Sequence, residues 1–107
     1  MIGNYKVVTI CGSTRFKEEF ERAVKRFTID GYIVLSVGVY THSDDEYLIK
    51  INDALKDMLC NMHRAKIDVC DEIFVINCMG YIGESTQQEI EYATRLGKQI
   101  KYLERID

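Results

Sequence analysis

The chain has 107 residues, enough for one domain with a hydrophobic core and too few for two, so residues 1–107 are expected to fold as a single domain. Apolar residues make up 47% and charged residues 29%, a composition that excludes a disordered chain. The net charge of -3 and the scattered basic residues give no electrostatic basis for binding nucleic acid. The sequence has no apolar run long enough to span a membrane and no signal-peptide pattern at Met1, which favours a cytoplasmic protein.

The cysteines show no pattern of a disulfide framework or a metal site. They are Cys11, Cys60, Cys70 and Cys78, and none of them forms a Cys-x-x-Cys pair or has zinc-site spacing with His42 or His63. Three of the four lie in or beside apolar runs, where cysteine is usually a small buried hydrophobic residue in a reducing compartment. We therefore expect no metal and no cofactor.

The first predicted elements are a strand and a helix. Residues 6–11 form a short run rich in β-branched side chains, typical of a strand. A helix is expected next, because apolar residues recur at helical spacing on one face, and Asp30-Gly31 is a typical helix end. That apolar face consists of Phe16, Phe20, Ala23, Val24 and Phe27.

A second strand and a long second helix are predicted next. Residues 32–39 are nearly all apolar, as expected of a parallel strand covered on both faces. Ser43 and Glu46 have the spacing of a capping box, which predicts the start of the helix. The apolar stripe of this helix, which we interpret as core packing, consists of Leu48, Ile51, Leu55, Met58 and Met62.

The remaining elements complete an alternating pattern. Residues 72–78 form a third predicted strand, a third helix begins at Ser85 or Thr86 and ends at Gly97, and residues 99–103 form a last short strand. This alternation predicts an α/β fold, a doubly wound, flavodoxin- or Rossmann-like parallel sheet of four to five strands with helices on both faces. Such sheets bind ligands where the strand order reverses, and a central first strand would bring two glycine-containing turns together there.

The turn after the first strand, residues 11–15 (Cys-Gly-Ser-Thr-Arg), is a candidate anion site. Gly12 allows the backbone to approach a ligand, and Ser13 adds a hydroxyl near a helix N-terminus, which favours anions. Arg15 and Lys17 are unfavourable beside the positive end of a helix dipole unless an anion is bound. The alternative is an ordinary glycine turn with a Ser/Thr cap, in which the acidic residues that follow offset the cations.

The turn before the third helix is the second candidate, because it supplies Gly83, Ser85 and the amides of a helix start. Glu89 follows Thr86 at the spacing of a capping box, and a capping role is one interpretation of this glutamate. However, helical spacing places Glu89 on the flank of the apolar stripe, away from the polar face of the helix. A carboxylate in that position would be partly desolvated, which suits a nucleophile or a general base.

Two further residues carry weaker signals. Asn77 lies at the carboxyl end of the third predicted strand, where an amide contacts a ligand or caps a turn. His63 lies near the end of the second predicted helix, where a cation stabilises the helix dipole, so a structural role is the alternative to a chemical one.

With these residues laid out, the chain resembles the nucleoside 2-deoxyribosyltransferase family and the related 5′-monophosphate deoxyribonucleoside N-glycosidases over nearly its whole length. Residues 11–15 are similar to the phosphate-side turn of the N-glycosidases, and residues 89–93 (Glu-Ile-Glu-Tyr-Ala) are similar to the family's Glu-Leu-Gly-Tyr-Ala segment. In the family that glutamate attacks the anomeric carbon and forms a covalent glycosyl-enzyme intermediate, and the resemblance implies this role for Glu89. It also implies that Gly12, Ser13, Arg15 and Ser85 meet the 5′ end of the ligand.

The second loop is also similar to the Gly-Gly-x-Gly-Thr-x-x-Glu segment of cytokinin-type phosphoribohydrolases, with residues 86–89 in register. Two positions depart from the deoxyribosyltransferase pattern. Thr9 stands where the family has a tyrosine that bonds the nucleophile. His63 stands where the family has an aspartate thought to protonate the leaving base, and a protonated imidazole is able to serve as that acid.

The function expected from these features is cleavage or transfer of the N-glycosidic bond of a (deoxy)nucleoside or its 5′-monophosphate, as a hydrolase or transferase of nucleotide metabolism. Glu89 would be the nucleophile and His63 the acid, with substrate bound by Gly12, Ser13, Arg15, Asn77, Gly83 and Ser85. The alternative is a non-catalytic nucleotide-binding sensor or regulatory domain. The expected partner is a small-molecule nucleoside or nucleotide, with no nucleic acid and no membrane. Because little chain is left to close the site at the C-terminus, we also expect a homodimer or higher homo-oligomer.

Overall fold

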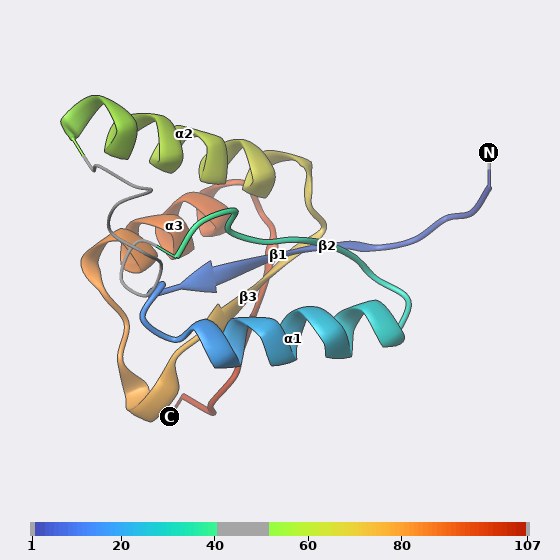
Figure 1. Ribbon diagram of the computed structural model, residues 1–107. Coiled ribbons are helices and arrows are strands. Elements are labelled where there is room, and N and C mark those ends of the chain that lie inside the picture. Colours follow the sequence, from blue (N-terminus) through green and yellow to red (C-terminus); the bar gives the residue numbers. More distant parts are fainter. Residues whose placement is uncertain (1, 41–51, 107) are drawn as a thin grey trace.

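The structure, a computed structural model, describes residues 2–40 and 52–106. Within this part of the chain, four parallel strands alternate with three α-helices (Figure 1). The strands are β1 (Val7–Gly12), β2 (Ile33–Leu35), β3 (Glu72–Ile76) and β4 (Gln99–Tyr102). The helices are α1 (Lys17–Ile29), α2 (Asp53–Val69) and α3 (Glu84–Arg95), and a short 3-10 helix, η1 (Cys78–Gly80), follows β3. The predicted α/β fold with a parallel sheet is confirmed.

The first strand is central, as the sequence predicts. The strand order is β2-β1-β3-β4, and every neighbouring pair is parallel. From β1 the chain passes to one side to form β2 and then returns to the other side to form β3, so the strand order reverses between β1 and β3. The turns that follow these two strands contain Gly12 and Gly83, and they meet at this reversal. This is the position at which open α/β sheets bind ligands.

Two hydrophobic clusters use alternate residues of β1 and β3. Val8, Ile10 and Ile76 pack with buried residues of α1, whereas Cys11 and Val75 pack with buried residues of α2 and α3. This two-residue alternation arises because successive side chains of a strand point to opposite faces. Figure 1 shows α1 on one side of the strands and α2 and α3 on the other.

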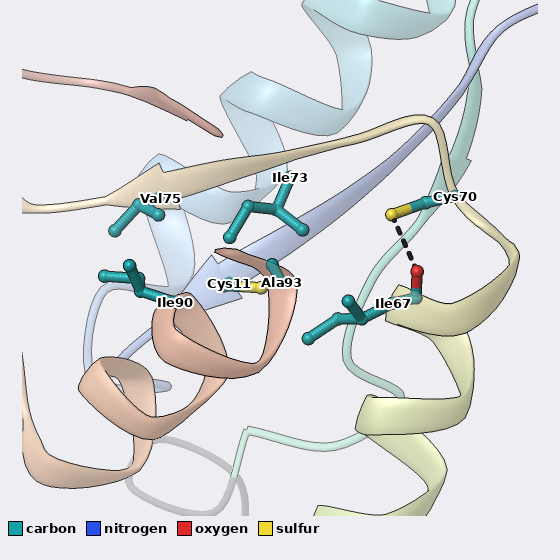
Figure 2. Packing of buried hydrophobic residues seen from close by; sticks show 7 residues of the cluster. All are labelled: Cys11, Ile67, Cys70, Ile73, Val75, Ile90 and Ala93. Atoms are coloured by element: carbon teal, nitrogen blue, oxygen red, sulfur yellow. Dashed lines mark hydrogen bonds between the residues drawn. The ribbon is translucent and has the colours of Figure 1, made fainter. Parts of the chain in front are cut away.

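Figure 2 shows the second cluster, in which α3 lies close to β1 and β3. Ile90 and Ala93 of α3 and Ile67 of α2 pack with the strand residues, and the Cys70 thiol donates to the Ile67 carbonyl at 3.1 Å. Cys11 and Cys70 are buried free thiols, as predicted from their apolar surroundings. The packing fixes the rotation of α3 about its axis, and therefore the direction of the side chain of Glu89, one residue before Ile90.

Two sequence expectations differ from the structure. The predicted strand over residues 32–39 is reduced to three residues, because β2 is an edge strand paired with β1 and its residue Ile33 is exposed. Met58 and Met62 are about half exposed, at 50% and 49%, so their interpretation as core residues is wrong. The buried residues of α2 are instead His63 and Ile67. The predicted capping box of Ser43 and Glu46 lies outside the described residues.

The helix α2 begins after Asn52, whose side chain accepts a hydrogen bond from the Leu55 amide at 2.8 Å. This is an ordinary N-cap. Among the described helices, none is both long and apolar enough to cross a membrane.

Gly12 marks the point where β1 ends close to β3. Its φ is 152°, and a Cβ added there would lie 2.8 Å from Cβ of Ile76 and 3.0 Å from the Ile76 carbonyl oxygen. Both the backbone conformation and the space therefore require glycine.

We expect Gly12→Ala to lower the free energy of unfolding by about 2–5 kcal/mol, because backbone strain and overpacking both act at this position. Urea denaturation measures the effect. Gly38→Ala is the matched control, since a Cβ at Gly38 meets no atom of the described residues within 4 Å, and its effect should stay within about 0.5 kcal/mol. Equal effects of the two substitutions would contradict the close packing of β1 on β3.

Candidate functional site

A cavity of about 780 Å³ opens at the carboxyl end of β1, between the glycine turns and the buried side of α2. A volume of this size suits a small-molecule ligand. The structure brings seven of the eight predicted site residues together in its wall: Gly12, Ser13, Arg15, His63, Gly83, Ser85 and Glu89.

Glu89 takes no part in capping its helix. The helix α3 begins at Glu84, with Gly83 as the N-cap residue and no side-chain cap hydrogen bond. Glu89 therefore lies in the second turn, too far along the helix for the capping box with Thr86 that the sequence suggested, and that alternative is wrong. Its side chain is 15% exposed and borders the cavity.

Three polar side chains from three elements converge at the base of this cavity. The Cys11 Sγ of β1 lies 3.4 Å from the His63 Nε2 of α2, and the same Nε2 lies 3.7 Å from the Glu89 Oε1 of α3. The Cys11 Sγ also lies within 4.8 Å of a Glu89 carboxyl oxygen. The three donor atoms lie within 4.8 Å of one another. We call this group the Cys-His-Glu cluster.

Burial favours the neutral form of each member of the cluster. It raises the pKa of Glu89 to about 7, against a partial opposing effect of the neighbouring Cys11 thiol and the charge of Arg64. It lowers the pKa of His63 to about 4, with a further contribution from the charge of Lys66. It raises the pKa of the Cys11 thiol well above its ordinary value, and the charge of Glu89 adds to that rise. The 3.7 Å contact between His63 and Glu89 is therefore not an ion pair near neutral pH.

These pKa values define what each group is able to do. Near neutral pH, Glu89 is divided between its acid and its carboxylate, which suits a nucleophile or an acid–base catalyst. The Cys11 thiol is protonated and so is a poor nucleophile. His63 is a neutral imidazole whose Nε2 is directed at Glu89, an arrangement that suits positioning of the carboxylate.

The predicted anion turn lies one residue ahead of the helix. The helix α1 begins at Lys17, and its N-cap residue is Phe16 rather than Ser13. The Ser13 hydroxyl instead accepts hydrogen bonds from the Arg15 amide at 3.4 Å and from the Arg15 Nε at 3.0 Å.

The aromatic ring of Tyr81 connects the two glycine turns. The Arg15 guanidinium lies 4.6 Å from the ring centroid, and the Phe16 ring meets it edge-on at 6.0 Å between centroids. Tyr81 and Arg15 both line the cavity, so the guanidinium is held at the cavity wall by an aromatic face and a hydroxyl. Tyr81 was not among the residues predicted from the sequence, although its position three residues before the N-terminus of α3 and next to a glycine turn is a usable signal.

Asn77 is the predicted site residue that the described part of the cavity wall does not include. Its side-chain amide donates to the Glu104 carbonyl at 2.9 Å and accepts from the Glu104 amide at 2.7 Å, and the side chain is fully buried. It thus fixes the segment after β4 to the end of β3, and it is not among the cavity-lining residues that the structure describes.

Cys11 is the site residue whose role the sequence analysis missed. The resemblance drew attention to Thr9, but the Thr9 hydroxyl donates to the Lys66 carbonyl at 2.9 Å. Cys11 follows two residues later on the same face of β1, nearer the carboxyl end of the strand, and its Sγ lies 3.4 Å from the His63 Nε2 and within 4.8 Å of the Glu89 carboxyl group. The usable signal was the two-residue spacing between Thr9 and Cys11, which places a polarisable side chain on the strand face that packs against α3.

Comparison with protein-family models, with curated proteins and with solved structures finds no match to this chain. The geometry of the site therefore carries the functional argument.

Glu89 should make the folded state less stable as the pH rises. Its pKa in the folded state is about 7 against an ordinary value of 4.5, so its contribution to stability is present below about pH 4.5 and is lost as the pH rises through 7. His63 acts in the opposite direction, since its contribution is present above its ordinary pKa of 6.5 and is lost as the pH falls through about 4.

The substitution Glu89→Gln isolates the glutamate contribution, because His63 is common to both proteins. We expect the free energy of unfolding of Glu89→Gln, relative to the unmodified protein, to increase by about 2–3 kcal/mol between roughly pH 5 and pH 8. Urea denaturation at both pH values measures this difference. Glu91→Gln, an exposed position on the same helix, should show no such change. A pH-independent effect of Glu89→Gln would mean that Glu89 has an ordinary pKa.

Proposed function

We propose that this protein cleaves or transfers the N-glycosidic bond of a nucleoside or nucleoside 5′-monophosphate, with Glu89 as the nucleophile. The observation that carries the proposal is the position of the Glu89 carboxyl group, almost buried at the wall of a cavity that both glycine turns also line. A carboxylate beside a ligand-sized cavity is equipped to attack an electrophilic carbon, and the turns are suited to hold the remainder of the ligand.

The reaction would proceed in two displacements. A carboxylate oxygen of Glu89 attacks the anomeric carbon, the bond between this carbon and the base nitrogen breaks, and the base leaves with the bonding electron pair and takes a proton. Water or a second base then attacks the anomeric carbon and gives up a proton to solvent, and the ester bond to Glu89 breaks to release the carboxylate. Dividing one difficult displacement into two easier ones is the advantage of covalent catalysis.

The neighbours of Glu89 would prepare it for this step. The Cys11 thiol and the His63 Nε2, which lies 3.7 Å from the Glu89 Oε1, would restrict the orientation of the carboxyl group. Because the imidazole is neutral near pH 7 and faces the nucleophile, we assign His63 to positioning rather than to the proton donation that the sequence suggested. Solvent in the cavity then protonates the leaving base.

The turn that contains Arg15 would bind the 5′ end of the substrate. The guanidinium is already oriented by Ser13 and Tyr81, which reduces the entropy lost when it binds an anion. A 5′-phosphate is the group in the proposed substrates that this cation fits best.

Glu89→Gln should abolish release of free base from a panel of nucleosides and 5′-monophosphates, measured by chromatography, because the amide is a poor nucleophile. Glu91→Gln, with its exposed carboxylate, should retain activity. Full turnover in Glu89→Gln would overturn the mechanism. Ligand-induced thermal stabilisation without base release in the unmodified protein would instead support the nucleotide-binding sensor. This function is favoured by the neutral imidazole of His63, which is not protonated near pH 7 and so is not the acid that the reaction would use.

Arg15→Ala should raise KM for 5′-monophosphates by about tenfold to a hundredfold, the loss expected for one charge-assisted hydrogen bond, and should leave KM for the nucleosides nearly unchanged. Arg22→Ala is the control, since Arg22 pairs with Glu18 on the exposed surface of α1. An equal loss for nucleosides and monophosphates would contradict the assignment of Arg15 to the phosphate.

A further inference from the structure

We propose that the Cys-His-Glu cluster is a binding site for a divalent transition-metal ion of the zinc class, with Cys11 Sγ, His63 Nε2 and Glu89 Oε1 as its protein ligands. The cysteine spacings in the sequence gave no indication of such a site, because its three ligands come from three separate elements of the fold. The proposal stands on the distances between the three atoms, their chemistry and their position at the cavity.

The distances fit a tetrahedral ion. With metal–ligand bonds of about 2.0–2.3 Å, the ligand atoms of a tetrahedral zinc site lie about 3.3–3.6 Å apart. The observed separations are 3.4 Å between Cys11 Sγ and His63 Nε2 and 3.7 Å between His63 Nε2 and Glu89 Oε1. All three pairs lie within 4.8 Å, so shifts of a few tenths of an ångström to about one ångström complete the coordination.

The direction of the imidazole distinguishes a metal site from a catalytic triad. In a Cys-His-Glu triad the thiol and the carboxylate contact different ring nitrogens, because the histidine transfers a proton at one nitrogen while the acid orients the other. Here the sulfur and the carboxylate oxygen both approach Nε2. Three potential ligand atoms gathered within 4.8 Å of one another are what a cation site requires.

The ligand set selects the class of ion. A thiolate and an imidazole favour zinc-class ions, whereas magnesium and calcium prefer oxygen ligands alone. A thiolate and a carboxylate carry two negative charges, which neutralise a divalent cation and so reduce the cost of burying it. On binding, the Cys11 thiol, and Glu89 where it is protonated, release their protons to solvent, and the metal accepts lone pairs from sulfur, nitrogen and oxygen.

Three protein ligands leave one tetrahedral position free. The cluster borders the cavity through His63 and Glu89, so a water molecule or a ligand group is able to occupy that position. A bound ion would also use the carboxylate that the proposed glycosyl transfer needs, and the metal-loaded protein should therefore be inhibited. That consequence rests on the proposed function, whereas the metal site itself does not.

Titration of the chelator-treated full chain with Co²⁺ tests the site independently of any activity. We expect one Co²⁺ per chain, with a near-ultraviolet thiolate-to-cobalt charge-transfer band and the visible absorption of tetrahedral cobalt. Zn²⁺ should displace the Co²⁺ and remove both features, and Mg²⁺ should not. Absence of the charge-transfer band in the unmodified protein would overturn the proposal.

Variants assign the ligands. Cys11→Ser should lose the charge-transfer band. Glu89→Gln should weaken Co²⁺ binding by at least about a hundredfold, because losing a residue that only hydrogen-bonds to a metal ligand already costs up to that factor, and Glu89 would be a ligand itself. Cys60→Ser is the matched control, since Cys60 lines the same cavity but is not one of the three converging residues, and it should keep the spectrum. Circular dichroism checks that each variant is folded. A band that is lost in Cys60→Ser and kept in Cys11→Ser would overturn the assignment.

Base release by the metal-free protein is measured in parallel. A metal site without base release would leave the present inference intact and refute the proposed glycosidic chemistry. Base release without a charge-transfer band would refute the metal site and support the proposed glycosidic chemistry.

Discussion

The site depends on one constraint: three polar side chains share a largely buried space between β1, α2 and α3, with their donor atoms within 4.8 Å of one another. An unpaired polar group in that position would cost about 1–3 kcal/mol, so the orientations of Cys11, His63 and Glu89 are mutually determined. The same burial explains why the pKa values of Glu89 and His63 move in opposite directions. It keeps His63 uncharged near pH 7 and leaves Glu89 divided there between its acid and its carboxylate.

The sheet brings these groups together. With β1 in the centre, the same face of the strand that carries Cys11 also packs against α2 and α3, and the close approach of Gly12 to Ile76 keeps β1 and β3 in register at the end where the cavity opens. Ile90 and Ala93 hold α3 against the sheet, so Glu89 must point along the boundary between core and cavity. Packing that stabilises the fold thus also sets the geometry of the site.

Much of this arrangement was predictable from local patterns. The alternation of strands and helices predicted a parallel sheet with β1 in the centre, and the glycine turns predicted the position of the cavity. Helical spacing also separated Glu89 from the polar face of α3. These features follow from short-range periodicity and backbone geometry, which a single sequence reveals.

The details that depend on long-range contacts were not predictable. Cys11 has the surroundings of an ordinary buried cysteine in the sequence. Only the fold places it beside His63 and Glu89, which follow it by 52 and 78 positions. Asn77 was expected at the ligand, but its amide forms two hydrogen bonds with the backbone of Glu104. The stripe on α2 had the correct period, yet Met58 and Met62 are about half exposed, because the rotation of α2 is set by His63 and Ile67. Periodicity defines a helix face, whereas tertiary packing decides how far that face is covered.

The central claim is that Glu89 is a nucleophile toward an anomeric carbon. Its most direct test is intact-protein mass spectrometry after incubation with 2′-deoxy-2′-fluoro nucleosides and their 5′-monophosphates, since the fluorine slows hydrolysis of a glycosyl ester. The account predicts an added mass equal to that of the fluorinated sugar, or sugar phosphate, which peptide mapping places on Glu89 and which is absent from Glu89→Gln. Release of base with no adduct, or an adduct on another residue, would contradict it.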